Sequence, residues 1–287
     1  MVHAAIEITP AAVRTRVSAL RSGSAGDLVD RFVPVEAVQA NLDRIAAIVA
    51  DGAAAARSAG AEGVDLVISP DLRGTRMAQL LDRRLGTIVS GVRSPEPGAQ
   101  IAARFIAATT GHPSVEPGSI VGVAGLGHSS LGIAVGATGE APGWIGSRPI
   151  GIDRLTSRVR FEDPPTPVQL DVARTSCARS LATLQPPAFD DLLVVSDFEA
   201  VIVGLCGAGA SPGHLDAALD WVLGRTSDEL SAMTGFDLHL ARLLPAAIAV
   251  HQALASTFEA TVTPVTPDPA AEMALADLIP VGDTRER

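Results

Sequence analysis

The chain contains no lysine and no tyrosine, and all 22 of its basic residues are arginines. A phosphate-binding P-loop, the strand lysine of a protein kinase and a Schiff-base enzyme each depend on a lysine amine. These three classes are therefore excluded. Cysteine is also scarce, because Cys177 and Cys206 are the only two in 287 residues. Two cysteines make no disulfide framework in a chain of this length, which favours a reducing, cytoplasmic compartment.

Positive charge is in short supply as well. The sequence has 32 acidic residues and a formal net charge of −10. Nucleic acids and anionic membranes bind through clustered positive charge, so neither is expected as a partner. The first residues lack a basic segment followed by an apolar run, and no signal peptide is expected. Hydrophobic residues make up 47% of the chain, which is enough for a sizeable core.

One uncharged stretch, residues 118–137, is long enough to span a bilayer. It contains six glycines, and its apolar residues fall into two short runs, 120–124 and 131–135. This pattern favours two buried strands around a Gly/Ser turn over a transmembrane helix.

Elsewhere, strand-like and helix-like segments interleave, which predicts an α/β fold with mixed sheets. Further strands are expected at residues 2–8, 13–20, 65–69, 87–90, 144–150, 192–195 and 260–263, the last ended by Pro264. Helices are expected at residues 34–59, 73–85, from about 98 to 109, and at 168–184, 215–223, 227–234, 238–257 and 270–278. We find no internal sequence repeat.

Several local motifs are weak by themselves. Residues 125–130, GLGHSS, nearly match a dinucleotide loop, but a strand follows where that site needs a helix. The six histidines show no metal-ligand spacing, so no metal site is expected. Cys206 has no evident base nearby, which is typical of a buried inert thiol. Asp197 and Glu199 follow a predicted strand; they either line a binding site, or Asp197 caps a helix that begins near Phe198.

Five segments, taken in order, resemble motifs of the exopolyphosphatase / guanosine pentaphosphate phosphatase (Ppx/GppA) family, within the actin–hexokinase–Hsp70 (ASKHA) superfamily. Here AIEITPAAVR (5–14) is similar to the family pattern AIDIGTNSxR, ISPDLRGTRM (68–77) to ATSALRDARN, and GLGHSSLG (125–132) to DIGGGSxE. Further along, SRPIGIDRLT (147–156) is similar to SLPxGxxRLT, and DPP (163–165) matches the DPP that follows it. The last two segments are the most specific. The resemblance implies two actin-like (ribonuclease H-like) α/β lobes, residues 1–118 and 119–287, with a cleft between them.

In this family, loop N–H groups bind phosphate while carboxylates hold Mg²⁺ and orient water. Many of the matching positions differ in this sequence. Glu7 stands in place of the leading Asp, and the Gly-Thr-Asn-Ser that follows it reads Thr-Pro-Ala-Ala at 9–12. Gly125 and Gly132 replace the acids of the second loop. The catalytic glutamate aligns with Val92 or, in a shifted register, with Glu96. Glu7 and Glu96 are therefore the catalytic candidates.

Loss of one catalytic group typically costs a factor of about 10² to 10⁴ in rate. Because several such positions differ in this sequence, we predict a catalytically inactive pseudoenzyme with a binding or regulatory role. No cofactor is expected. A phosphorylated small molecule is the expected ligand. The resemblance implies the following binding residues: Arg14, Arg73, Arg76, Gly127, Ser129, Ser130 and Arg154. The same arginines could instead form internal salt bridges.

Two alternatives stay open. The first is an active Mg²⁺-dependent phosphohydrolase whose carboxylates have moved to Glu7, Glu96, Asp197 or Glu199. The second is a scaffolding partner of an active paralogue, as a heterodimer; a homodimer is also expected from the family.

Overall fold

The computed structural model describes residues 2–21, 24–93, 95–110, 112–269 and 272. By their mutual contacts, the described residues form two compact units. The first comprises residues up to Ala107 together with Asp268, Pro269 and Glu272, and the second runs from Ala108 to Pro267. The first unit thus ends before the expected boundary at residue 118, and the chain returns to it after Pro267.

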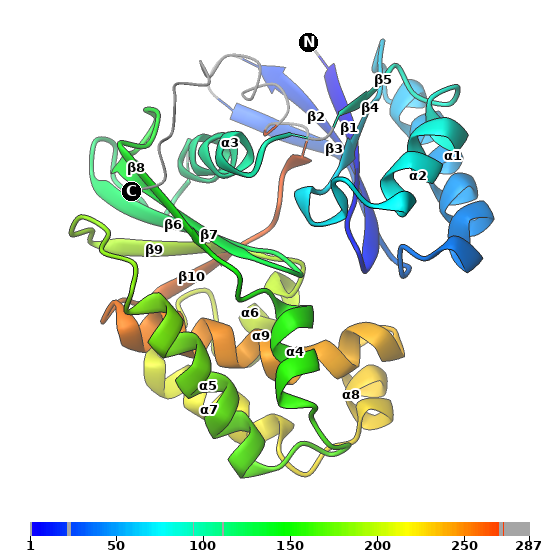
Figure 1. Ribbon diagram of the computed structural model, residues 1–287. Coiled ribbons are helices and arrows are strands. Elements are labelled where there is room, and N and C mark those ends of the chain that lie inside the picture. The colour runs from blue at the N-terminus through cyan, green and yellow to red at the C-terminus, as the bar shows by residue number, and fades with distance from the viewer. Residues whose placement is uncertain (1, 22–23, 94, 111, 270–271, 273–287) are drawn as a thin grey trace. The chain divides into compact units, whose positions relative to one another are not determined.

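The first unit is built on a five-stranded mixed sheet in the order β3-β2-β1-β4-β5 (Figure 1). Its strands are β1 (Val2–Ile8), β2 (Ala12–Arg21), β3 (Ser24–Pro34), β4 (Asp65–Ile68) and β5 (Gly91–Arg93). β1 is antiparallel to β2 and parallel to β4. The register sets Glu7 opposite Arg14, so both side chains lie on the same face of the sheet.

The two faces of this sheet differ in polarity. Ile6, Ile8, Val13 and Val17 point to one face and belong to a large apolar core that includes residues of α1 (Leu42–Ser58) and α2 (Arg76–Leu85). Glu7 and Arg14 are buried on the other face. Here α3 (Pro97–Thr109) supplies Gln100 as a partner of Glu7. The alternation along β1 and β2 therefore places these two charged residues on the face opposite the apolar core.

The second unit repeats the same strand order, with β8-β7-β6-β9-β10 in place of β3-β2-β1-β4-β5. Its strands are β6 (Ile120–Leu126), β7 (Leu131–Ala137), β8 (Trp144–Arg148), β9 (Asp191–Val195) and β10 (Val262–Val265). β6 pairs antiparallel with β7 and parallel with β9, as β1 does with β2 and β4. The chain therefore contains a structural repeat that its sequence does not show.

The described residues of the second unit also form six helices (Figure 1). They are α4 (Ile152–Val159), α5 (Pro167–Leu181), α6 (Glu199–Cys206), α7 (Pro212–Val222), α8 (Ser227–Thr234) and α9 (Leu238–Thr257). Thr166 and Thr226 begin α5 and α8 with capping boxes, which satisfy the first free N–H groups. By length and composition α9 could cross a membrane, but 83% of that window is buried inside the protein. This burial is typical of a core helix.

The uncharged stretch 118–137 forms β6 and β7, which confirms two strands around a turn. The expected helix at 34–59 was wrong at its start, because β3 continues to Pro34 and α1 begins at Leu42. β3 was missed because it carries charged residues, which an edge strand tolerates. α4 was also missed, and its region was assigned only by the family pattern.

Two strand predictions were displaced. The strand expected at 87–90 lies at Gly91–Arg93, and residues 87–90 form turns. Pro264 does not end the last strand but lies within β10, opposite Val194. β10 is an edge strand, where a proline without an N–H can be accommodated. The helix expected at 270–278 falls almost wholly outside the described residues.

Candidate functional site

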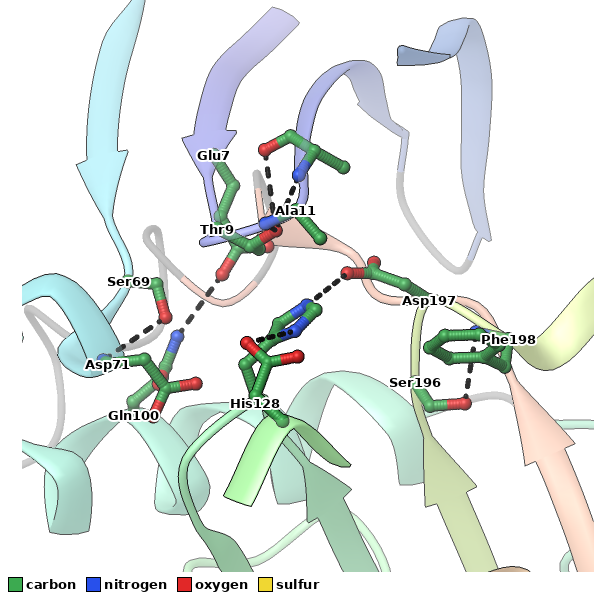
Figure 2. Close-up of polar contacts among 12 residues, drawn as sticks. Glu7, Thr9, Ala11, Ser69, Asp71, Gln100, His128, Ser196, Asp197 and Phe198 are labelled. Atoms are coloured by element: carbon green, nitrogen blue, oxygen red, sulfur yellow. Dashed lines mark hydrogen bonds and ion pairs between the residues drawn. The ribbon is translucent and has the colours of Figure 1, made fainter. Parts of the chain in front are cut away.

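The turn between β1 and β2 replaces the first phosphate loop of the resemblance, and its amides bond within the turn. The Thr9 hydroxyl accepts the N–H of Ala12 at 3.1 Å and that of Ala11 at 3.4 Å, as Figure 2 shows. The N–H of Thr9 donates to the Ala12 carbonyl at 2.9 Å. Pro10 has no N–H to offer. The donors that a phosphate would need are thus engaged by the chain itself.

Glu7, a predicted catalytic residue, is buried near the end of β1, where its side chain is 5% exposed. The Gln100 amide donates to its Oε1 at 3.4 Å (Figure 2), and the Arg104 guanidinium lies 3.8 Å from the same oxygen. Gln100 and Arg104 are four residues apart on α3 and so share one helix face. The Glu7 carboxylate is therefore held by two partners from α3.

Arg104 makes a second, closer ion pair with Glu272. Its Nε and Nη2 donate to the two Glu272 oxygens at 3.0 and 3.1 Å, and both side chains are nearly buried. One guanidinium thus lies beside two buried carboxylates, which lowers the cost of removing them from water. Sequence reasoning missed this group. Only the four-residue spacing of Gln100 and Arg104 hinted at it, and nothing pointed to Glu272.

Glu96, the other catalytic candidate, lies on the surface. It forms an ion pair with Arg73 at 2.5 Å, with the two side chains 60% and 42% exposed. The hydrogen bond from Arg73 lowers the pKa of Glu96 below its usual value. A base that is ionised and already bound to a guanidinium is poorly suited to accept a proton. For Arg73, the internal salt bridge is the observed alternative.

The remaining arginines of the first unit differ in exposure. Arg76, at the start of α2, is exposed. Arg14 is buried, and its guanidinium lies 5.1 Å from the centre of the Phe32 ring, a cation–π distance.

In the second unit, the β6–β7 turn is joined to the start of α4. The turn closes through the Gly127 N–H, which donates to the Ser130 carbonyl at 3.0 Å. Its carbonyls accept the first N–H groups of the helix: Gly127 from Ile152 at 3.1 Å and His128 from Asp153 at 2.8 Å. A free helix N-terminus is a ready anion site, but these α4 donors are engaged by the turn.

His128 lies in this turn at the position of a glycine in the family loop, and only 5% of its side chain is exposed. Its Nδ1 is 3.3 Å from Asp153 Oδ2, and its Nε2 is 3.8 Å from Asp197 Oδ2. Burial lowers the pKa of His128, but the two carboxylates outweigh burial and raise the pKa to about 10. A pKa raised in this direction favours the imidazolium form at neutral pH. The sequence showed His128 without revealing either partner.

Asp197 does not cap α6, contrary to one reading of the sequence. The residue at the helix N-cap is Phe198, which makes no side-chain capping bond. The Ser196 hydroxyl accepts the Phe198 N–H at 3.3 Å, as Figure 2 shows, and Asp197 turns toward His128 instead. Glu199 accepts a hydrogen bond from the Thr266 hydroxyl at 3.0 Å.

The predicted ligand residues of the second unit fall close together. Gly127, Ser129 and Ser130 lie in the β6–β7 turn, partly exposed, and Arg154 lies exposed in the first turn of α4, which that turn caps. Those of the first unit differ in burial: Arg14 is buried, while Arg73 and Arg76 are on the surface.

The resemblance implies a Mg²⁺ ion, which the carboxylates of this chain would have to coordinate. Within the described ranges, no group of three or more His, Cys, Asp or Glu side chains is arranged to hold a metal ion. Glu7 is beside Arg104, and the other close carboxylates, Asp153 and Asp197, flank a cationic ring. A hard divalent cation requires several oxygen ligands and is repelled by a neighbouring positive charge. These residues do not fit Mg²⁺.

No protein-family model matches this sequence, and no curated protein sequence matches it. Solved structures do match. The Ppx/GppA family member from Aquifex aeolicus is 16% identical, with a TM-score of 0.77 over 97% of both chains. An exopolyphosphatase from Cytophaga hutchinsonii is 14% identical, with a TM-score of 0.78 over 98% of this chain and all of the other.

An exopolyphosphatase-like protein is 15% identical and matches with a TM-score of 0.78, over 96% of this chain and 98% of its own. The fold expected from the sequence motifs is thereby confirmed. From one end to the other, this chain has the two-domain α/β fold of the Ppx/GppA proteins.

Proposed function

We propose that this chain is a Ppx/GppA-type protein that does not hydrolyse phosphoanhydrides and acts by binding. The observation that carries the proposal is the β1–β2 turn, where the Thr9 hydroxyl holds the amides that would face a phosphate. Loss of a single oxyanion or phosphate donor typically costs on the order of 10²-fold in turnover. Here several donors are engaged at once.

The carboxylates support the same proposal. Glu7 is bound by Gln100 and lies beside Arg104, and Glu96 is paired with Arg73. Orienting a water molecule requires an acceptor that is not already bonded to cations. In this proposal no metal ion takes part, because the described carboxylates do not fit one.

As ligand we propose a phosphorylated small molecule that contacts Ser129, Ser130 and Arg154. The exposed guanidinium of Arg154 can bind a phosphate group through its planar fork. Binding should then weaken in Arg154→Gln and stay unchanged in Arg179→Gln, an exposed arginine on α5. Equal binding by both variants in calorimetry would remove Arg154 from the proposal. A related protein of the same fold is the proposed protein partner.

The deciding experiment is phosphate release from polyphosphate and from guanosine pentaphosphate, with Mg²⁺ or Mn²⁺, beside an active Ppx/GppA enzyme. We expect no release above the buffer. Turnover of about one per second or more would refute the proposal, since that is an ordinary enzymatic rate.

If release occurred, Glu7→Gln and Glu96→Gln would test the relocated carboxylates. Asp43→Asn, whose exposed partner is Arg84, is the matched control for removing a carboxylate. Loss of rate in the first two variants alone would establish the active alternative.

A further inference from the structure

We infer that His128 is a protonated imidazole whose positive charge holds the Asp153 and Asp197 carboxylates together. Through these contacts it positions the β6–β7 turn, the first turn of α4 and the turn before α6. This goes beyond the proposed function, because it assigns a positioning residue and a source of positive charge that belong to the chain itself.

The His128 ring lies between side chains from two other elements of the second unit. His128 belongs to the β6–β7 turn, Asp153 to the first turn of α4 and Asp197 to the turn after β9. The imidazole is nearly buried, with Asp153 Oδ2 at 3.3 Å from Nδ1 and Asp197 Oδ2 at 3.8 Å from Nε2. One carboxylate thus lies at each ring nitrogen, and they come from two different elements.

The number of N–H donors on an imidazole depends on its protonation state. A neutral ring has one N–H and presents a lone pair at its other nitrogen. That lone pair would face a carboxylate, an arrangement that is repulsive in a buried place. Only the imidazolium has an N–H at both nitrogens, so a carboxylate beside each nitrogen favours the charged form.

The backbone of His128 binds the same helix that its side chain faces. Its carbonyl accepts the N–H of Asp153 at 2.8 Å, while its ring faces the Asp153 carboxylate. The turn and α4 are therefore attached twice through one residue pair. The Asp197 contact extends this attachment to the loop that leads into α6.

An imidazolium between two carboxylates supplies the charge that a bound cation would otherwise supply. Both carboxylates have a counter-ion that is part of the chain, so these turns need no divalent metal to remain in place. The region should accordingly be ordered and stable in the presence of a chelator.

The protonation state is measured directly by NMR of the imidazole nitrogens in the full chain. We expect both His128 nitrogens to carry hydrogen between pH 6 and pH 8, because the pKa of His128 is raised to about 10. A ring that loses its proton near the ordinary histidine value of about 6.5 would overturn the inference.

Variants separate the charge from simple packing. His128→Gln should lower Tm by about 5 °C, since it removes the positive charge that lies between the two carboxylates. Adding Asp197→Asn to His128→Gln should then recover part of that loss. His214→Gln, at an exposed histidine on α7, is the control and should leave Tm unchanged. If the double variant recovered nothing, His128 would only fill space and the inference would fail.

Metal dependence completes the test. Millimolar Mg²⁺ or a chelator should leave the wild-type Tm unchanged. A rise in Tm with Mg²⁺ that is lost in Asp153→Asn would assign the cation role to the metal and overturn the inference. These readouts do not involve phosphate release, so failure of this inference and failure of the proposed function are distinguishable.

Discussion

Gly151 and His128 lie in direct backbone contact, so close that a Cβ on Gly151 would be 2.3 Å from the carbonyl carbon and oxygen of His128. Gly151 has φ −76° and ψ 168°, a conformation that any residue adopts. The requirement for glycine is therefore one of space. This contact brings the β6–β7 turn onto the start of α4.

Gly151→Ala should destabilise the protein by about 1–3 kcal/mol, because the methyl group forces two backbone segments apart. Gly143→Ala is the matched control, since a Cβ there meets nothing within 4 Å. Thermal unfolding of the two variants measures the difference. Equal Tm values would show that the turn and helix can separate freely.

Thr9→Val should cost about 1–3 kcal/mol, because it removes the hydroxyl that accepts the Ala11 and Ala12 N–H groups while keeping the shape of the side chain. Thr9→Ser keeps that hydroxyl and should recover most of the stability. Denaturant unfolding of both variants distinguishes the hydrogen bonds from packing. A valine variant as stable as the serine variant would contradict this account of the turn.

Arg104→Gln should be strongly destabilising, by about 3–5 kcal/mol, since it leaves the buried Glu7 and Glu272 without their guanidinium. Arg84→Gln breaks an exposed ion pair with Asp43 and should cost less than about 1 kcal/mol. The comparison is made by chemical unfolding at neutral pH. Similar small losses in both would mean that the Glu7 face admits water.

His251 should make the protein sensitive to acid. Burial lowers its pKa to about 4 from 6.5, although its Nδ1 bonds the Ala247 carbonyl. Between these two values the unfolded chain binds a proton that the folded chain excludes, so stability falls as pH drops through this window. The loss is on the order of 3 kcal/mol.

His251→Leu removes this titration and places an apolar side chain at the same buried position of α9. Measured from pH 7 to pH 4, wild-type stability should fall relative to the variant. Parallel pH curves would show that folding does not lower the pKa of His251.

The local elements followed from sequence patterns where those patterns were strong. Residues 2–8, 227–234 and 238–257 were predicted with the bounds that β1, α8 and α9 have. β3 and α4 were missed, because an edge strand carries charge and an eight-residue helix shows little periodicity. Such elements depend on the neighbours they pack against.

The contacts within the candidate site were harder to predict from the sequence. Glu7 was identified by its place in a motif, but its partners Gln100 and Arg104 lie more than ninety residues away in the sequence. Asp197 was seen beside a strand end, and its contact with His128 could not be derived from spacing. Long-range pairing of polar side chains has no periodic signal in a sequence.

By itself, the sequence determined the class of this protein: an α/β chain without lysine chemistry, with segments that resemble motifs of the Ppx/GppA proteins. Only the tertiary structure decided what the remaining polar groups do. It paired Glu7 with α3 and set His128 between Asp153 and Asp197. The physical reason is that local pattern sets which face of an element is apolar, whereas the partner of a buried charge is chosen by which elements pack together.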